Sequence, residues 1–267
     1  MTKQAMEALT AEVALAQELA HGLSAEEWAA ASDCDGWRVQ DVFAHMASVF
    51  HQVGDPSSTP EGATDDAEAT AELMLVSRRE LTPSDVMDEY REWSVKALDA
   101  LGAMQEPPMS EVVIPLGNLG SHPLHLLANA LAFDHYCHLR HDILAPSGPV
   151  DRPAFPIDDL RITPILDGML GGMPQMCTEA LVVVDRPMNL VFEGAGASSW
   201  IVRPADEEGG FVIIEPGRDL AAVATATTGG HEFVQWGTKR RDWRESGVQV
   251  EGDEAYASAV LDAFNAI

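Results

Sequence analysis

The sequence is poor in basic residues, in cysteine and in long apolar runs. It has 16 Lys and Arg against 43 Asp and Glu, a formal net charge of −27 at pH 7, and 3 cysteines among 267 residues. A surface this acidic repels the phosphates of nucleic acids and anionic lipids, so we expect neither as a partner. No stretch approaches the roughly 18 to 20 apolar residues that a membrane-spanning helix needs, so we expect no membrane segment.

The cysteines and the N-terminal residues bear on the cellular compartment. Cys34, Cys137 and Cys177 are odd in number and widely spaced, which argues against a disulfide framework. Cys34, in a turn, and Cys137, within a helix, are interpreted as structural residues. The first twenty residues match neither a secretory signal nor a transit peptide. These observations predict a protein of the reducing cytoplasm.

Apolar periodicity changes near residue 150. Before it, helical spacing predicts helices at 3–21, 39–53, 67–80, 83–101 and 123–144, with a short helix capped by Ser24 after the first. Residues 54–66 and 105–120 are rich in turn formers and indicate loops. Closely spaced Pro and Gly between 146 and 153 break both helix and strand. We therefore predict a helical domain over 1–146, a linker over 147–157 and a second domain over 158–267.

The second domain has a different pattern. A helix is expected at 158–177 and another at 253–264, and between them lie short β-type runs at 181–184, 190–193, 200–203, 211–215 and 222–227. The predicted fold class is therefore α+β, with an N-terminal four-helix bundle followed by a small α+β domain that contains an antiparallel sheet.

Histidines gather on one predicted helix. Five of the nine lie on or beside 123–144: His122, His125, His135, His138 and His141. Residues three or four apart share a helix face, so His138 can pair with Asp134, His135 or Asp142. An imidazole and a carboxylate one turn apart can bind the same divalent cation.

A tight site needs a further ligand from a facing helix. His45 is the candidate, because its neighbours mark the apolar stripe of the helix at 39–53. Two histidines and a carboxylate with an open coordination position are typical of catalytic sites. The predicted ligands are His45, Asp134 and His138. The alternative ligands or orienting partners are His135, His141, Asp142, Asp41 and Arg140. Taken singly, His45 also fits a hydrogen-bonded core residue, and the outer histidines fit surface residues.

Two segments resemble a known family. Residues 23–46, which include Leu23-Ser24-Ala25-Glu26-Glu27-Trp28 and Asp41-Val42-Phe43-Ala44-His45, resemble the N-terminal signature of the mycothiol-dependent maleylpyruvate isomerase family. Residues 133–142 resemble its metal-binding helix, and 234–237 and 248–253 resemble, more weakly, its C-terminal domain. The resemblance implies a DinB-like metal-binding four-helix bundle followed by a sterol-carrier-like domain.

The resemblance also implies a ligand set. His45 and His138 match family ligands for a divalent metal, taken as zinc, and Asp134 stands where the family has Glu. Asp is one methylene shorter, so either Asp134 binds through water or His135 takes its place. In the family an Arg beside a Trp-Gly pair is implicated in activity. Here that role falls to Arg240 or Arg241, or is missing.

The activity implied by the resemblance is thiol chemistry. A low-molecular-weight thiol, mycothiol or another, would lose its proton at the open metal position and add to a small-molecule electrophile. Addition, rotation and elimination would give cis-trans isomerisation, and relatives would transfer the sulfur. Two other classes stay open: a non-catalytic protein that binds a small apolar ligand, and a hydrolase that uses metal-bound water. The sequence specifies neither substrate, metal nor oligomeric state.

Overall fold

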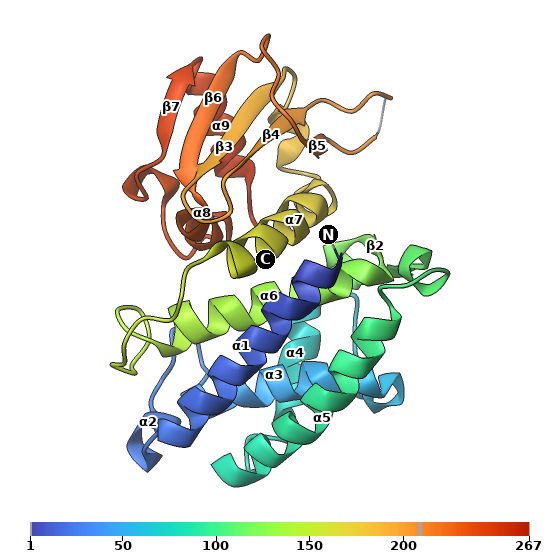
Figure 1. The fold of residues 1–267 in the computed structure, drawn as a ribbon, viewed down its shortest axis with the longest axis vertical. Helices are drawn as coiled ribbons and strands as arrows, with labels where there is room; N and C mark the ends of the chain where they lie inside the picture. Colours follow the sequence, from blue (N-terminus) through green and yellow to red (C-terminus); the bar gives the residue numbers. More distant parts are fainter. Residues whose placement is uncertain (1, 208–209, 267) are drawn as a thin grey trace. The chain divides into compact units, whose positions relative to one another are not determined.

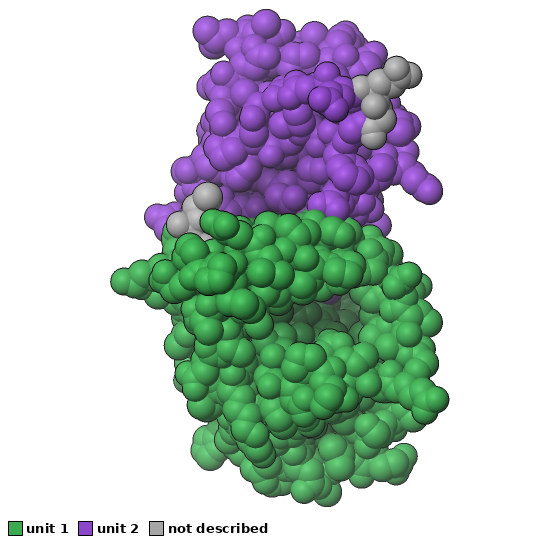
Figure 2. Space-filling model, turned by 90° about the vertical axis from the view of Figure 1, so that its right-hand side faces the viewer, with its two compact units in different colours: residues 1–156 green, residues 157–267 purple. Residues whose placement is uncertain are grey.

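The computed structural model describes residues 2–207 and 210–266. The chain divides into two compact units, unit 1 (residues 1–156) and unit 2 (residues 157–267), which Figure 2 colours green and purple. Each has its own set of helices and strands (Figure 1). Within the described ranges, no helix combines the length and apolar character that crossing a membrane requires.

Unit 1 is helical. Its α-helices are α1 (Thr2–Gly22), α2 (Ala25–Ala29), α3 (Val39–Gly54), α4 (Ala67–Val76), α5 (Pro83–Ala103) and α6 (Leu127–Cys137). Helix α3 packs mainly on α5, and α1 packs on α6 and α5, so these four form the bundle (Figure 1). Their apolar stripes meet in one core, which confirms the predicted four main helices.

Local sequence signals set several helix starts. Ser24 accepts a hydrogen bond from the Glu27 amide at 3.2 Å, and the Glu27 carboxylate accepts one from the Ser24 amide at 2.8 Å. This capping box satisfies amides that the first turn of α2 leaves without partners. Thr82 caps α5 in the same way, with Pro83 at the first helical position.

The connector between α5 and α6 contains short elements. A two-stranded antiparallel sheet joins β1 (Val113–Pro115) to β2 (Ser121–Pro123). The 3-10 turns of unit 1 are η1 (Pro56–Ser58), η2 (Met109–Glu111), η3 (Gly117–Leu119) and η4 (Leu124–Leu126). The prediction that Pro123 opens a helix is wrong, because Pro123 ends β2 and α6 begins only after η4.

The helix expected to continue to residue 144 changes its winding. After Cys137 the chain forms a π-helix, η5 (His138–Ile143), and all six of its residues are buried. The Leu144 amide donates to the Leu139 carbonyl five residues back, at 3.2 Å. A π-helical turn inserted at the end of an α-helix often accompanies a functional site.

Unit 2 combines helices with one sheet. Its elements are α7 (Asp159–Met176), η6 (Leu181–Val183), β3 (Met188–Glu193), β4 (Ser198–Arg203), β5 (Ile213–Pro216), β6 (Ala224–Gly229), α8 (Gly230–Gly237), η7 (Trp243–Glu245), β7 (Gln249–Gly252) and α9 (Glu254–Ala263). The strand order is β5-β4-β3-β6-β7. The pairs are antiparallel except β3 with β6, which run parallel with Leu190 opposite Ala226. The predicted α+β class is confirmed, and the sheet is mixed through this single pair.

Two parts of unit 2 differ from the prediction. Residues 181–184 were expected as a strand, but Leu181–Val183 form a 3-10 turn. The side chain of Val182 is 77% exposed, so the apolar residue at this position does not belong to a buried strand. Helix α8 and strand β7 were not predicted. Helix α8 is short, yet it buries Phe233, Val234 and Trp236.

Candidate metal centre

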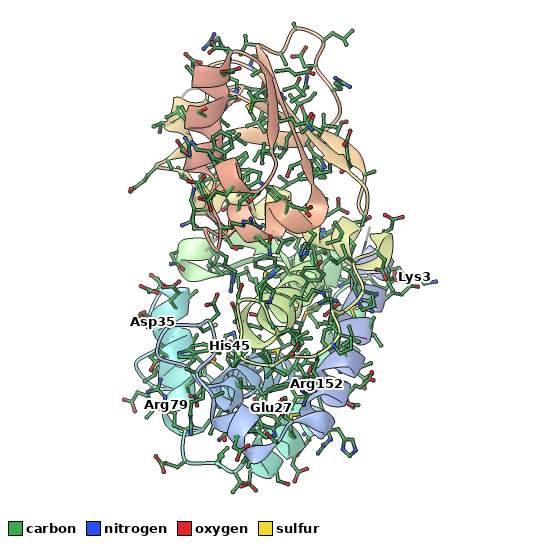
Figure 3. All side chains as sticks on the ribbon, turned by 90° about the vertical axis from the view of Figure 1, so that its left-hand side faces the viewer. Lys3, Glu27, Asp35, His45, Arg79 and Arg152 are labelled. Atoms are coloured by element: carbon green, nitrogen blue, oxygen red, sulfur yellow. The ribbon has the colours of Figure 1, made fainter. Side chains whose placement is uncertain are left out.

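His45 enters the interior of unit 1 from α3. Its neighbours Val42 and Met46 are fully buried, so the apolar stripe of the helix turns the imidazole inward. Figure 3 shows His45 within the bundle. Its Nε2 lies 3.2 Å from Oδ1 of Asp134, and its side chain is 11% exposed.

Asp134 and His138 come from the end of α6 and the start of η5. The spacing of four residues places both side chains on one face, with His138 Nε2 3.3 Å from the same Oδ1 of Asp134. The rings of His45 and His138 are 5.0 Å apart between centroids. The three donor atoms all lie within 4.8 Å of one another. The structure therefore brings together the three residues predicted as ligands.

The donor set fits a divalent cation. Two ligands held about 2.0–2.1 Å from one ion at a near-tetrahedral angle lie about 3.3 Å apart, close to the two separations in the cluster. His45 Nδ1 and Asp134 Oδ2 are buried and make no hydrogen bond with the described part of the chain. Two imidazoles and one carboxylate leave a coordination position open, as catalytic rather than structural sites do.

Electrostatics couple the three side chains. Burial alone would raise the pKa of Asp134, but the charges of His138 and His45 and their hydrogen bonds hold it well below its usual range. Burial would lower the pKa of His138, whereas Asp134 and hydrogen bonds to Asp134 and Asp142 raise it well above its usual value. The carboxylate thus attracts positive charge to the cluster. A divalent cation would take the place of the imidazole protons.

Asp142 lies behind His138. Its Oδ2 accepts a hydrogen bond from His138 Nδ1 at 2.7 Å, and its side chain is 2% exposed. A proton held on Nδ1 leaves the lone pair of Nε2 directed at Asp134. This is the arrangement by which a carboxylate fixes the tautomer of a metal-ligating histidine.

His135, the alternative ligand, lies beside Asp134, with its Nδ1 3.6 Å from Asp134 Oδ2, but its hydrogen bonds go to other residues. Its Nδ1 lies 3.0 Å from the Leu131 carbonyl oxygen and its Nε2 lies 3.1 Å from the Tyr90 hydroxyl. The ring is fully buried, and burial lowers its pKa to about 4. Both ring nitrogens are engaged, so Asp134 is the residue that stands beside the two imidazoles.

Arg140 and Asp41, predicted as alternative ligands or orienting partners of the histidines, have other partners in the structure. Arg140 donates to both carboxylate oxygens of Glu12, at 2.7 and 3.0 Å. Asp41 accepts from Arg38 at the start of α3. Glu12 and Arg140 form a buried ion pair, whereas Asp41 is buried and its partner Arg38 is 40% exposed. Neither pair includes a histidine of the cluster.

The remaining predicted residues lie elsewhere. His141 is buried, with its ring centroid 6.2 Å from that of Tyr136. Arg240 and Arg241 are exposed in unit 2, in the segment between α8 and η7.

Two residues near the cluster were missed by the sequence reasoning. The ring of Trp37 lies 5.2 Å from that of His45 and 6.3 Å from that of His138, and its Nε1 donates to Glu72 at 2.9 Å. Cys34 Sγ lies 3.8 Å from His138 Nδ1, so this cysteine is not only a turn residue. The available signal was the Cys-Asp-Gly-Trp turn directly before the helix that carries His45.

The fold and the cluster define a class of protein, in which a helical bundle with a two-histidine, one-carboxylate centre is joined to an α+β unit. Residues 9–140 match the family model of the mycothiol maleylpyruvate isomerase N-terminal domain. This region of the chain therefore belongs to the mycothiol maleylpyruvate isomerase N-terminal domain family, which confirms the family resemblance inferred from the sequence.

Solved structures agree with this assignment at the level of the fold. The crystal structure of the mycothiol-dependent maleylpyruvate isomerase aligns with a TM-score of 0.54 and 14% identity, over 94% of this chain and 93% of that one. A histidine-to-alanine mutant of the isomerase aligns with a TM-score of 0.52 and 13% identity over the same shares. No curated protein sequence matches the chain significantly.

Proposed function

We propose that this protein is a divalent-metal enzyme that activates a low-molecular-weight thiol, mycothiol or a close analogue, for addition to a small electrophile. The observation that supports this most directly is the convergence of His45 Nε2 and His138 Nε2, from separate helical elements, on one carboxylate oxygen of Asp134. The solved isomerases that share the fold are named as mycothiol-dependent.

His45, Asp134 and His138 would hold the cation, and zinc suits two nitrogen donors and one oxygen donor. A bound cation would supply the positive charge that deprotonates a coordinating thiol near neutral pH. Asp134 contributes a single negative charge, so the protein ligands leave a dication with net positive charge that favours an anionic fourth ligand. This charge balance distinguishes the centre from a closed structural site with several thiolates.

Two neighbouring side chains would prepare the centre. Asp142 holds the proton of His138 on Nδ1, which keeps Nε2 available as a donor. Trp37 places an aromatic ring beside both imidazoles and is itself fixed by Glu72. Its apolar ring reduces the space for water next to the thiol, which favours a thiolate nucleophile over hydroxide.

The electrophile would carry an activated double bond or another centre that a thiolate attacks. Addition to an activated cis alkene, rotation about the resulting single bond and elimination of the thiolate give the trans isomer. Protonation of the adduct in place of elimination leaves the sulfur bound to the substrate as a thioether, which is S-transfer. Arg240 and Arg241 are proposed to act on an anionic substrate. Their alanine variants should then slow turnover and leave the metal content unchanged.

Elemental analysis of the purified protein is the first test. We expect about one divalent metal per chain, as for a single catalytic site. The metal should be lost in His45→Ala and His138→Ala and retained in His21→Ala, which changes an exposed histidine of α1. A metal-free wild-type protein, or equal retention in all three variants, would refute the proposed centre.

Thiol consumption is the second test. The metal-loaded protein is assayed with mycothiol and maleylpyruvate, with mycothiol and an aryl halide, and with each electrophile alone. Turnover that requires the thiol supports the proposal, and the electrophile that is consumed separates isomerisation from S-transfer. Hydrolysis that proceeds equally well without thiol would assign the open position to water.

A further inference from the structure

The turn before α3 is fixed against η5 by backbone hydrogen bonds. The Asp33 amide donates to the Asp142 carbonyl at 2.9 Å, and the Trp37 amide donates to the Cys34 carbonyl at 3.0 Å. Within the turn, the Cys34 amide donates to Ser32 Oγ at 3.2 Å. These hydrogen bonds hold the backbone of Cys34 beside the π-helix.

This thiol belongs to a second group of donor atoms. Cys34 Sγ is 3.8 Å from His138 Nδ1, and Nδ1 is 2.7 Å from Asp142 Oδ2. Donor atoms of Cys34, His138 and Asp142 all lie within 4.8 Å of one another. The group uses the opposite ring nitrogen of His138 from the one that faces Asp134. Because the two nitrogens of an imidazole point away from each other, the two groups cannot share one ion.

We infer that Cys34, His138 Nδ1 and Asp142 form a second cation site, selective for soft divalent ions such as zinc or cadmium. A thiolate, an imidazole nitrogen and a carboxylate are a donor set that these ions prefer. Sulfur at about 2.3 Å and nitrogen at about 2.0 Å from one ion lie roughly 3.6 Å apart, close to the Cys34–His138 separation. Thiolate and carboxylate together cancel the charge of a dication, and the negative charge of the deprotonated His138 ring is shared between the two ions that it joins.

Binding at this site displaces two protons. The thiol proton of Cys34 and the Nδ1 proton of His138 go to solvent, and the hydrogen bond between Nδ1 and Asp142 opens to admit the ion. The ring gives up its second proton reluctantly, so the second ion binds more weakly than the first. The acidic chain, with a net charge of −27, attracts cations to its surface.

Cadmium titration of the purified protein, with the first site filled, tests the inference. A cadmium–thiolate bond has a charge-transfer absorption in the ultraviolet, which we expect to grow until about one further equivalent is bound. Cys34→Ser should abolish this absorption and keep the first equivalent of metal. The control is Cys177→Ser, which changes a buried thiol of unit 2 that donates to the Asn265 carbonyl at 3.0 Å and should keep the absorption.

The outcomes separate this inference from the proposed function. No absorption in the wild-type protein, or absorption that survives in Cys34→Ser with an unchanged far-ultraviolet circular dichroism spectrum, overturns the second site. A wild-type protein that binds no first equivalent of metal overturns the proposed function. The absorption itself depends on the Cys34 thiolate and not on the reaction at the first site.

Discussion

The two units bury different kinds of interior. Among its described residues, unit 1 encloses nine side chains that carry charge or an imidazole: Glu12, Asp41, His45, His122, His135, His138, Arg140, His141 and Asp142. Among the described residues of unit 2, Arg161 is the only buried side chain of this kind. Its core rests on aromatic rings, with Phe233 lying 5.1 Å from Phe192 and 4.8 Å from Trp236.

The difference shows which unit can do polar chemistry. A buried charge is costly unless a partner or a metal compensates it. In an interior rich in such groups, the sequence must therefore place a partner beside each charged side chain. The aromatic core of unit 2 is held by apolar burial and ring packing, which bring no titratable groups together. We therefore place the proposed metal chemistry in unit 1, and each prediction below perturbs one of the two interiors.

The largest effect in unit 1 is expected at the Glu12–Arg140 pair. Arg140→Met leaves the fully buried Glu12 without its guanidinium partner and should cost about 3–5 kcal/mol in the free energy of unfolding. The double variant Glu12→Leu/Arg140→Met should recover most of this loss, because no buried charge is left behind. Urea denaturation measures both. A loss below about 1 kcal/mol in the single variant would mean that the pair is not part of the polar interior.

A comparable loss in unit 2 should come from an apolar residue. Phe233→Ala removes a ring that is fully buried among three others and should cost about 3–5 kcal/mol. The matched control, Phe211→Ala, changes a ring that is 52% exposed and should stay within about 0.5 kcal/mol. Equal effects of the two variants in urea denaturation would argue against an aromatic core.

A smaller effect is expected behind the metal centre. Asp142→Asn keeps the size of the side chain but weakens the hydrogen bond that orients His138, and should lower zinc affinity about 10- to 100-fold. Competition with a chelator measures this affinity. Asp35→Asn changes an exposed carboxylate in the turn before α3 and should leave it unchanged. An unaltered affinity in Asp142→Asn would remove Asp142 from the centre.

The smallest effect concerns the start of α3 and depends on pH. Burial alone would raise the pKa of Asp41, but hydrogen bonds from Arg38 and its charge lower it below the usual value. This stabilisation is therefore present above the unfolded pKa of about 3.9 and is lost as the pH falls through the lower folded value. Asp41→Asn should cost about 1 kcal/mol at pH 7 and progressively less below pH 4. Urea denaturation of the variant and the wild-type protein at pH 7 and below pH 4 measures this cost. A cost that does not change with pH would contradict the role of the Asp41 charge.

Much of the fold follows from local sequence signals. The capping box at Ser24 and the Thr82-Pro83 pair act on neighbouring amides, so they set helix starts wherever the helix lies. Strands β3, β4 and β6 were found because their apolar runs are bounded by turn formers. The strand predicted at 181–184 is wrong because apolar composition alone does not show whether a segment is buried. Helix α8 was missed because eight residues are too few to show a helical period.

The candidate site divides in the same way. His138 and Asp134 are one turn apart, so their pairing could be predicted from spacing. His45 needed the apolar stripe of a second helix, and the resemblance supported it. The proximity of Cys34 to His138 could not be predicted, because it depends on a hydrogen bond between the Asp33 amide and a carbonyl more than 100 residues away. Helical periodicity carries no information about such a contact.

The winding of the π-helix η5 depends on the number of residues between 138 and 143. It holds one residue more per turn than an α-helix, so deletion of a single residue between 139 and 141 would allow ordinary α-helical winding to resume. Helix α6 would keep its place, and the residue that is now Asp142 would follow His138 by three positions instead of four. Members of the family that lack this extra residue would have to place the carboxylate behind their metal-binding histidine at a different spacing along the chain.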